Sequence, residues 1–299
     1  RYKTSEELIQ GGRIYMADRQ TIERLKDQAL EMRELILKLS AKTLIHLGGD
    51  LSMADMMTAL YMYKMKKNLD YDGKWPERDR FVLSKGHGAG CLYIAMAMAG
   101  YGSVDEIFET YGAWGSRYGM HPCKNQNPGM EVSSGSLGHG LTLCSGLALA
   151  AKERGDKHHV FTMLGDGECN EGAVWEGAML AAHYKLGNLV ALIDRNMVSL
   201  SSPTEEFYGG LKLEPLGKKF EAFGWNVMEI NGNCMEEVVE ALDNIPDADS
   251  DVPTVIIGHT IKGYGVSFME GTPAWHHGML TDPALLEQAL TEVRQTRYK

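Results

Sequence analysis

Short apolar segments alternate with longer segments of helical pattern from residue 80 onward, and this alternation constrains the fold more than any other feature. The apolar segments, each a candidate strand, cover residues 80–84, 159–164, 188–194, 225–230 and 254–260. The helical segments cover residues 88–100, 138–153, 171–186, 211–223 and 234–245. Strands that are separated by helices predict a parallel sheet with helices on both faces. We therefore expect an α/β fold.

Both ends of the chain predict further helices. Apolar residues recur at three- and four-residue steps from Ile22 to Leu39, which is the spacing of one helix face within residues 18–46. A second helix is expected to begin after a glycine turn, with Ser52 as its N-cap. A terminal helix is expected after Pro283. Because no linker or internal repeat is visible, we predict a single domain over residues 1–299 with an N-terminal helical extension.

The composition argues against several classes of protein. No apolar run reaches the roughly 18 residues that span a bilayer, and no N-terminal segment has the pattern of a signal peptide, so no membrane partner is expected. The net charge of −10 argues against a nucleic-acid partner, because a phosphate backbone requires a basic surface. The five cysteines are scattered and include no C-x-x-C pair. This favours free thiols in a reducing cytoplasm and no structural zinc site.

Polar residues with a distinctive spacing follow two of the apolar segments. Asp166 lies between Gly165 and Gly167 after residues 159–164, and Asn196 follows residues 188–194. If the two strands are neighbours, both side chains lie at the sheet edge where ligands bind in such folds. Either residue alone would also fit a plain Asx turn or loop. Together they favour a Mg²⁺–diphosphate site. Mg²⁺ binds a carboxylate, an amide oxygen and a backbone carbonyl, and it completes its shell with phosphate oxygens and water.

The segment from Gly165 to Asn196 resembles the thiamine diphosphate motif of transketolases, in which GDG is followed by Asn at this distance. Further motifs occur in that family's order, namely HLGGDLSMAD (46–55), RFVLSKGHGAGCLY (80–93), HP (121–122), GSLGHGL (135–141), GHTIKGYGVSFME (258–270) and WHHG (275–278). The resemblance covers nearly the whole chain. It implies the thiamine diphosphate-binding fold of the diphosphate (PP) domain, and the transfer of a two-carbon ketol unit from a ketose to an aldose.

The resemblance also implies which residues hold the cofactor. It implies that Mg²⁺, or Ca²⁺ or Mn²⁺ in its place, binds Asp166, Asn196 and the backbone carbonyl of Val198. Contacts with thiamine diphosphate are implied for His87, Gly135, Ser136, Leu137, Gly167, Glu168, Asn196 and His276.

Further roles are implied for the substrate channel and for assembly. His46, His121 and His276 are expected to donate to sugar hydroxyls and to move protons at the reacting carbonyl, for which an imidazole is suited near neutral pH. His277 is an alternative to His276, although the distance to the terminal helix favours His276. Two acidic residues are expected to form a carboxylate network at a subunit interface, namely Glu171 and Glu176.

The sequence departs from the family pattern near the expected substrate channel. Leu47 stands where the family has proline, Leu44 and Ile45 replace small polar residues, and Met120 replaces a glycine. These changes lie outside the metal and diphosphate motifs, so they leave the cofactor unaffected. They leave the identity of the sugar substrate open. It can be a sugar phosphate, a sugar with another anionic terminus such as a sulfonate, or a branched sugar.

A complete transketolase is longer and includes a pyrimidine-binding domain that activates the cofactor. The resemblance therefore implies the N-terminal subunit of a split transketolase, active with a C-terminal subunit that carries this domain. An α2β2 heterotetramer in carbohydrate metabolism, such as the pentose phosphate pathway, is the implied assembly and setting. Two alternatives stay open. One is a subunit of another thiamine diphosphate enzyme, such as a 2-oxo acid dehydrogenase or a deoxyxylulose-phosphate synthase, and the other is a non-catalytic homologue.

Overall fold

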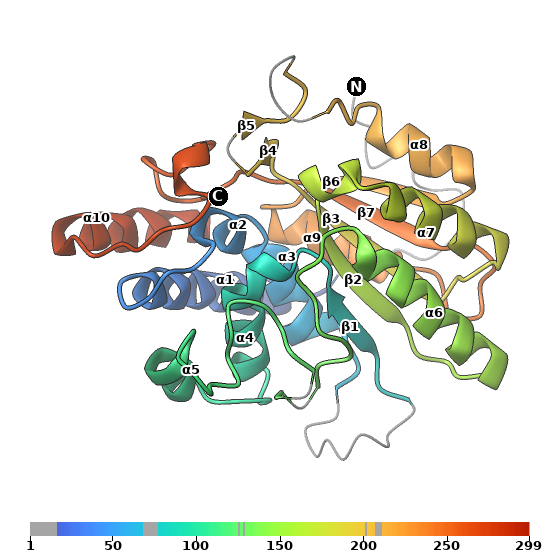
Figure 1. Cartoon of the computed structure of the whole chain (residues 1–299), viewed down its shortest axis with the longest axis horizontal. Coiled ribbons are helices and arrows are strands. Elements are labelled where there is room, and N and C mark those ends of the chain that lie inside the picture. The colour runs from blue at the N-terminus through green and yellow to red at the C-terminus, as the bar shows by residue number, and fades with distance from the viewer. Residues whose placement is uncertain are drawn as a thin grey trace.

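The computed structural model describes residues 17–67, 77–124, 126–127, 129–200, 202–206 and 211–298. At the centre of this part lies a five-stranded parallel sheet in the order β1-β2-β3-β7-β6 (Figure 1). Its strands are β1 (Arg80–Leu83), β2 (Val160–Gly165), β3 (Leu189–Arg195), β6 (Asn226–Asn231) and β7 (Thr254–His259). Every predicted apolar segment forms a strand, and the expected α/β fold is confirmed.

Helices cover both faces of this sheet (Figure 1). On one face lie α6 (His139–Arg154), α7 (Gly172–His183) and α8 (Leu216–Phe223). On the other lie α1 (Arg19–Ser40), α3 (Ala54–Ala59), α4 (Ala89–Met98) and α9 (Met235–Asp243). Alternate strand residues face the two layers, so Ala191 and Ile193 pack against the first set of helices while Val190 and Leu192 pack against the second. Because both faces bury apolar side chains, the strands appear in the sequence as continuous apolar runs.

The N-terminal helices differ in detail from the sequence prediction. Asp18 caps α1 by accepting a hydrogen bond from Thr21 N at 2.7 Å, and α1 ends at Ser40 instead of continuing to residue 46. The prediction that Ser52 caps a new helix is wrong, because Ser52 is the last residue of a short helix, α2 (Leu47–Ser52). Its hydroxyl donates to Asp194 at 2.6 Å. The helix α3 continues into a π-helical turn, Leu60–Lys64.

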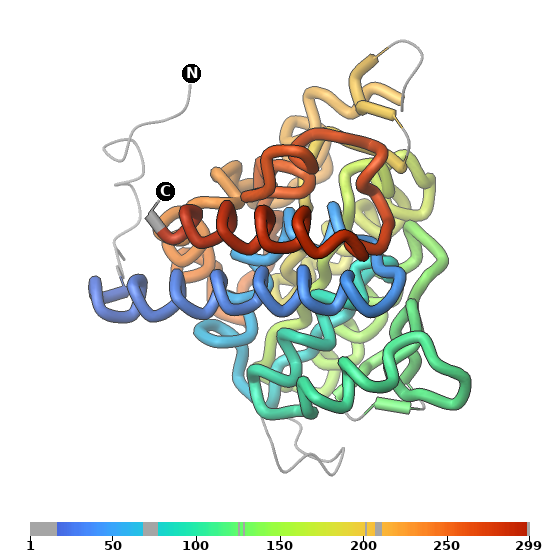
Figure 2. Tube along the Cα trace, turned by 90° about the vertical axis from the view of Figure 1, so that its left-hand side faces the viewer, coloured from blue at the N-terminus to red at the C-terminus, as the bar shows by residue number. Residues whose placement is uncertain are grey.

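The C-terminal helix α10 (Pro283–Arg294) confirms the prediction of a terminal helix. It lies beside α1, as Figure 2 shows, and Arg294 pairs with Glu34 of α1 at 2.9 Å. The sequence did not predict the short helix α5 (Val104–Thr110) or the small hairpin of β4 (Val198–Ser199) and β5 (Ser202–Pro203). Within the described ranges, no helix has both the length and the apolar character needed to cross a membrane.

The parallel direction of the strands brings the turns that follow them to one edge of the sheet. Gly165 at the end of β2 pairs with Asp194 in β3, and Asp194 pairs with Gly258 in β7. The segment after β1 joins the same edge, since Ser84 N donates to Met163 O at 2.9 Å. The sequence motifs that follow these four strands are therefore neighbours in space, where such folds bind their ligands.

Candidate active site

Asp166 lies in the turn after β2, and its carboxylate connects this turn with the segment after β3. One oxygen accepts a hydrogen bond from Gly167 N at 2.7 Å, and the other accepts from Met197 N at 2.6 Å and from Arg195 Nη1 at 3.1 Å. The side chain is only 2% exposed. Burial raises the pKa of Asp166, and the charge of Asp194 adds to this effect. A cation bound to Asp166 would oppose both causes, because it favours the charged carboxylate.

Asn196 and Val198 supply further oxygens next to this carboxylate. Asn196 Nδ2 donates to Asp194 Oδ2 at 2.9 Å, and Asn196 Oδ1 accepts from Val198 N at 3.1 Å, so the orientation of the amide is fixed. The described residues include no group of three or more His, Cys, Asp or Glu side chains suited to a metal. A divalent cation would therefore depend on one carboxylate and two neutral oxygens. This hard, oxygen-only set fits Mg²⁺ that takes its other ligands from phosphate and water.

A buried ion pair that the sequence analysis missed supports both turns. Lys85, after β1, donates to Asp194 Oδ2 at 2.5 Å and to Gly49 O at 3.2 Å. Asp194 also accepts from the hydroxyls of Ser52 at 2.6 Å and Thr260 at 2.5 Å. The Lys85 and Asp194 side chains are 1% and 0% exposed. Burial by itself would raise the pKa of Asp194, but the charge and hydrogen bonds of Lys85 and the hydroxyls hold it below its ordinary value. Asp194 is therefore a charged anchor that connects four segments.

Imidazole rings from four separate segments meet at this edge of the sheet. The ring of His46 lies in the middle, with its centroid 5.3 Å from that of His87, 6.0 Å from that of His121 and 5.5 Å from that of His276. The fold therefore brings together the histidines that the sequence assigned to cofactor and substrate. His276 is 8% exposed, whereas His277 is exposed and its ring lies 6.0 Å from that of His46. His276 thus faces the interior of the cluster and His277 lies at its margin.

Lys262, which the sequence analysis also missed, adds a second buried cation. Its ammonium group lies 2.7 Å from His276 Nδ1 and donates to Val198 O at 3.4 Å. Burial, followed by the charge of Lys85, lowers the pKa of Lys262 to about 8. Burial, followed by the charge of Lys262, lowers the pKa of His276 to about 3. Lysines after strands, in S-K-G-H and I-K-G-Y, are the sequence signal that could have identified both cations.

His46 and His87 show the same shortage of nearby negative charge as His276. Burial, followed by the neighbouring imidazoles and lysines, lowers the pKa of His46 to about 4. Burial and the charge of Lys85 lower the pKa of His87 far below its ordinary range. An anion placed among these groups would reverse the electrostatic part of each shift. The cluster has the chemistry of a site for a multiply charged anion such as a diphosphate.

Glu168 ties the loop of residues 135–141 to the turn after β2. One carboxylate oxygen accepts from the Ser84 hydroxyl and from Gly138 N, the latter at 2.8 Å, and the other accepts from Gly165 N at 3.0 Å. The side chain is 3% exposed. Because both oxygens bond within the protein, Glu168 positions these two segments, and its predicted contact with the cofactor stays a prediction.

The segment from Gly135 to Leu137 lies beside the histidine cluster. Gly135 has a φ of +148°, and a Cβ at this position would lie 3.2 Å from the His121 ring. Ser136 and Leu137 are exposed. A glycine is needed at Gly135 because of both its φ and its contact with His121. The segment can therefore bring backbone groups close to a ligand, and its predicted contacts with the cofactor stay a prediction.

Glu171 and Glu176 are exposed near the start of α7. The helix α7 packs against α6, and this pair of helices also carries two exposed apolar side chains, Leu143 in α6 and Met179 in α7. The expected carboxylate network of the two glutamates across a subunit interface stays a prediction.

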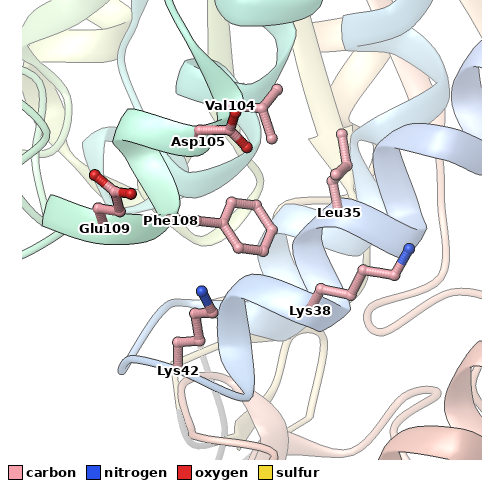
Figure 3. Close-up of a pocket in the computed structure, with 7 residues that line it drawn as sticks. All are labelled: Leu35, Lys38, Lys42, Val104, Asp105, Phe108 and Glu109. Carbon is pink, nitrogen blue, oxygen red and sulfur yellow. The ribbon is translucent and has the colours of Figure 1, made fainter.

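A depression lies between α1 and α5 (Figure 3). The Lys42 ammonium group lies 5.3 Å from the centre of the Phe108 ring there. The depression is lined by Leu35, Lys38, Lys42, Val104, Asp105, Phe108 and Glu109. None of these is a predicted site residue, so the depression is not part of the candidate active site.

Comparisons with known proteins agree with the motifs and the geometry. Residues 32–295 match the family model described as transketolase, thiamine diphosphate binding domain. The chain is 42% identical to an apulose-4-phosphate transketolase subunit of Actinobacillus succinogenes over 252 residues, which cover 84% of this chain and 89% of that protein. It is 39% identical to a 6-deoxy-6-sulfo-D-fructose transketolase subunit of a Clostridium species over 259 residues, which cover 86% of this chain and 92% of that protein.

Longer transketolases match over part of their length. Human transketolase is 35% identical over 281 residues, which cover 92% of this chain and 43% of the human protein. The crystal structure of a Pichia stipitis transketolase variant superposes with a TM-score of 0.80 at 28% identity, covering 90% of this chain and 40% of that one. The chain thus spans less than half the length of these two proteins, but most of the length of the two subunit relatives.

Proposed function

The chain belongs to the transketolase family, as a subunit that carries the thiamine diphosphate-binding domain, and from this we propose the part that its residues play. They form the metal and diphosphate side of an active site that transfers a two-carbon ketol unit from a ketose to an aldose. The observation that carries the proposal is the cluster of two buried lysines and four histidines next to an oxygen-only metal set. A Mg²⁺–diphosphate group accounts for both features, because the metal binds the oxygen ligands and the diphosphate neutralises the lysines and histidines.

Asp166, Asn196 and the Val198 carbonyl would hold Mg²⁺, with Ca²⁺ or Mn²⁺ as substitutes. The support is the chemistry of these three oxygens and the fixed orientation of the Asn196 amide. The Gly167 backbone would approach the diphosphate. Lys262 would neutralise part of its charge, because its ammonium group lies within this set, at 3.4 Å from the Val198 carbonyl.

His87 and His276 would complete the contacts with the diphosphate. When bound, thiamine diphosphate supplies a carbanion at its thiazolium ring, and this carries the two-carbon unit. The protein contributes by orienting the diphosphate and by excluding water from the buried lysines.

His46 and His121 would act on the substrate, with His276 between substrate and diphosphate. Their rings meet within 6.0 Å, so hydroxyls of a short sugar can reach more than one of them. Because the pKa of His46 is lowered to about 4, this imidazole is neutral near pH 7 and can accept a proton from a sugar hydroxyl. The names of the relatives, apulose-4-phosphate and 6-deoxy-6-sulfo-D-fructose transketolase subunits, support a sugar phosphate or a related anionic sugar as substrate. Substrates of the pentose phosphate type belong to the same class.

A C-terminal subunit with the pyrimidine-binding domain would complete the active site, in an α2β2 heterotetramer. The support is that two relatives of similar length are named as subunits, while the chain covers 43% of human transketolase. The proposed domain covers residues 1–299, and Glu171 and Glu176 would lie at the subunit interface. The five cysteines form no disulfide, which supports a reducing compartment, and we place the protein in the cytoplasm.

The test compares the purified chain, the chain co-expressed with its companion subunit, and a co-expressed Asp166→Ala variant. We expect ketol transfer between sugars only from the wild-type pair in the presence of thiamine diphosphate and Mg²⁺. Transfer by the chain alone would contradict the requirement for a second subunit. Decarboxylation of a 2-oxo acid without ketol transfer would support the other thiamine diphosphate enzymes instead. Failure of the pair to bind the cofactor in calorimetry would support a non-catalytic homologue.

A further inference from the structure

Three buried polar atoms next to the histidine cluster have no hydrogen-bond partner among the described residues. They are Nδ1 of His46, Oδ2 of Asp50 and the hydroxyl of Tyr111. None of them takes part in the contacts assigned above to metal or diphosphate. Leaving such a buried group unsatisfied costs about 1–3 kcal/mol, and proteins meet this cost with protein partners or ordered water.

The three residues belong to segments that touch one another. Asp50 N, in the first turn of α2, donates to the carbonyl of His46, the N-cap of this helix, at 3.0 Å. Tyr111 follows α5, and its neighbour Gly112 approaches the segment before His46, since a Cβ on Gly112 would lie 3.8 Å from Thr43 Oγ1. Burial, followed by the charge of Asp50, raises the pKa of Tyr111, so the carboxylate and the phenol influence each other.

The carboxylate of Asp50 is held in a defined orientation. Cys91 N donates to Oδ1 at 3.0 Å, which leaves Oδ2 as the unsatisfied atom. A Cβ on Gly90 would lie 2.7 Å from Oδ2, so a glycine is needed in α4 to make room for this oxygen. Asp50 is 0% exposed. Burial raises its pKa to about 7, while the Cys91 N–H and the charge of Lys85 act in the opposite direction.

We propose that His46, Asp50 and Tyr111 bind an ordered water that orients the His46 imidazole. The water accepts hydrogen bonds from His46 Nδ1–H and from the Tyr111 hydroxyl, and it donates to Asp50 Oδ2. This arrangement leaves His46 Nε2 as a hydrogen-bond acceptor for the substrate. Asp50 is then a positioning residue that acts through the water on His46. Only the role of His46 toward substrate rests on the proposed function, because the water site and the imidazole orientation do not depend on it.

The test is an NMR measurement of the His46 ring nitrogens in the full chain. In the wild type we expect the proton on Nδ1. In Asp50→Asn the amide group donates to the water, and the water then donates to His46 Nδ1, so the proton moves to Nε2. Tyr93→Phe is the matched control, because its hydroxyl donates to His121 O at 3.2 Å and its ring lies 6.0 Å from that of Tyr111. This control should keep the wild-type pattern. The same ring protonation in wild type and Asp50→Asn would overturn the proposal.

A high-resolution crystal structure of the wild-type chain tests the water site without any variant. Density for a water within hydrogen-bond distance of all three atoms supports the proposal, and direct contact between Asp50 and Tyr111 with no water overturns it. In the assembled enzyme, Asp50→Asn should lower kcat about tenfold, the smaller effect typical of residues that orient a functional group, with the cofactor Kd unchanged. If the proposed ketol transfer failed, the NMR and crystallographic outcomes would still decide the water site, since neither requires turnover.

Discussion

Replacing Lys85 with methionine should destabilise the chain, because it removes the only cation that contacts the buried carboxylate of Asp194 in the described structure. Removing one partner of a buried ion pair costs about 3–5 kcal/mol. Asp194 keeps three uncharged donors after the change, from Ser52, Thr260 and Asn196, so the lower end, about 3 kcal/mol, is expected. For a chain of 299 residues that loss corresponds to a decrease in Tm of about 5 °C. Methionine retains most of the lysine volume, so the loss reports on charge more than on packing.

A double-mutant cycle with Asp194→Asn isolates the pair. The double variant should recover part of the stability lost in Lys85→Met, because a neutral amide replaces the unpaired carboxylate. Denaturant unfolding of the four proteins measures the coupling. The exposed pair of Lys157 and Asp249, whose nitrogen and oxygen lie 3.0 Å apart, is the matched control, and its cycle should show no measurable coupling. A change in Lys85→Met no larger than that in Lys157→Met would refute the role of Lys85 as counter-ion.

Three further predictions concern the site. His276→Ala should weaken cofactor binding and lower kcat by about 100-fold or more, whereas His277→Ala should leave cofactor affinity unchanged. Cofactor titrations followed by tryptophan fluorescence compare the two variants. An equal loss of cofactor affinity in both would contradict the assignment of His276 as the active-site histidine. A chelator should release the cofactor from the assembled enzyme, and Asp166→Ala should abolish Mg²⁺-dependent binding in equilibrium dialysis; cofactor retained after metal removal would exclude a metal bridge. The contribution of His46 to stability should decrease as the pH falls from about 6.5 toward 4, because the unfolded chain takes up a proton near 6.5 while the folded pKa of His46 is about 4. His46→Asn should flatten this part of the profile in denaturant titrations, and an unchanged slope would contradict the cause.

The sheet could be predicted from the sequence because burial on both faces leaves a local signal. Each strand is a continuous apolar run, and its limits in the structure differ from the predicted ones by about one residue. The helix α2 could not be predicted in this way, since it includes Gly48 and Gly49, which are poor helix formers. It forms because distant groups hold it, with Asp50 bonded to Cys91 N and Ser52 bonded to Asp194. Tertiary contacts therefore outweighed the local preference that suggested a cap at Ser52.

The difference between local sequence signals and long-range contacts also separates the parts of the site that were predicted from those that were missed. Asp166 and Asn196 follow strands at a recognisable spacing, so the sequence could identify them. Lys85 and Asp194 contact each other across 109 positions of the chain, and Asp194 appears in the sequence as the last residue of an apolar run. Its buried charge becomes visible only when the lysine is placed beside it. Glu168 also holds two glycine segments together, a role that the sequence did not reveal, and its contact with the cofactor stays a prediction.

The distribution of charge explains how an acidic chain can serve an anionic cofactor. The net charge is −10, yet two lysines and the imidazole cluster lie together at one edge of the sheet. Exposed charges are screened beyond about 8 Å at physiological ionic strength, so the acidic exterior does not oppose an anion already in the site. Mg²⁺ alone would be repelled by the positive charges of Lys85 and Lys262, and a diphosphate alone would be repelled by the negative charges of Asp166 and Asp194. Each ligand relieves the repulsion that the other would feel, so both together should stabilise the fold by more than the sum of their separate effects.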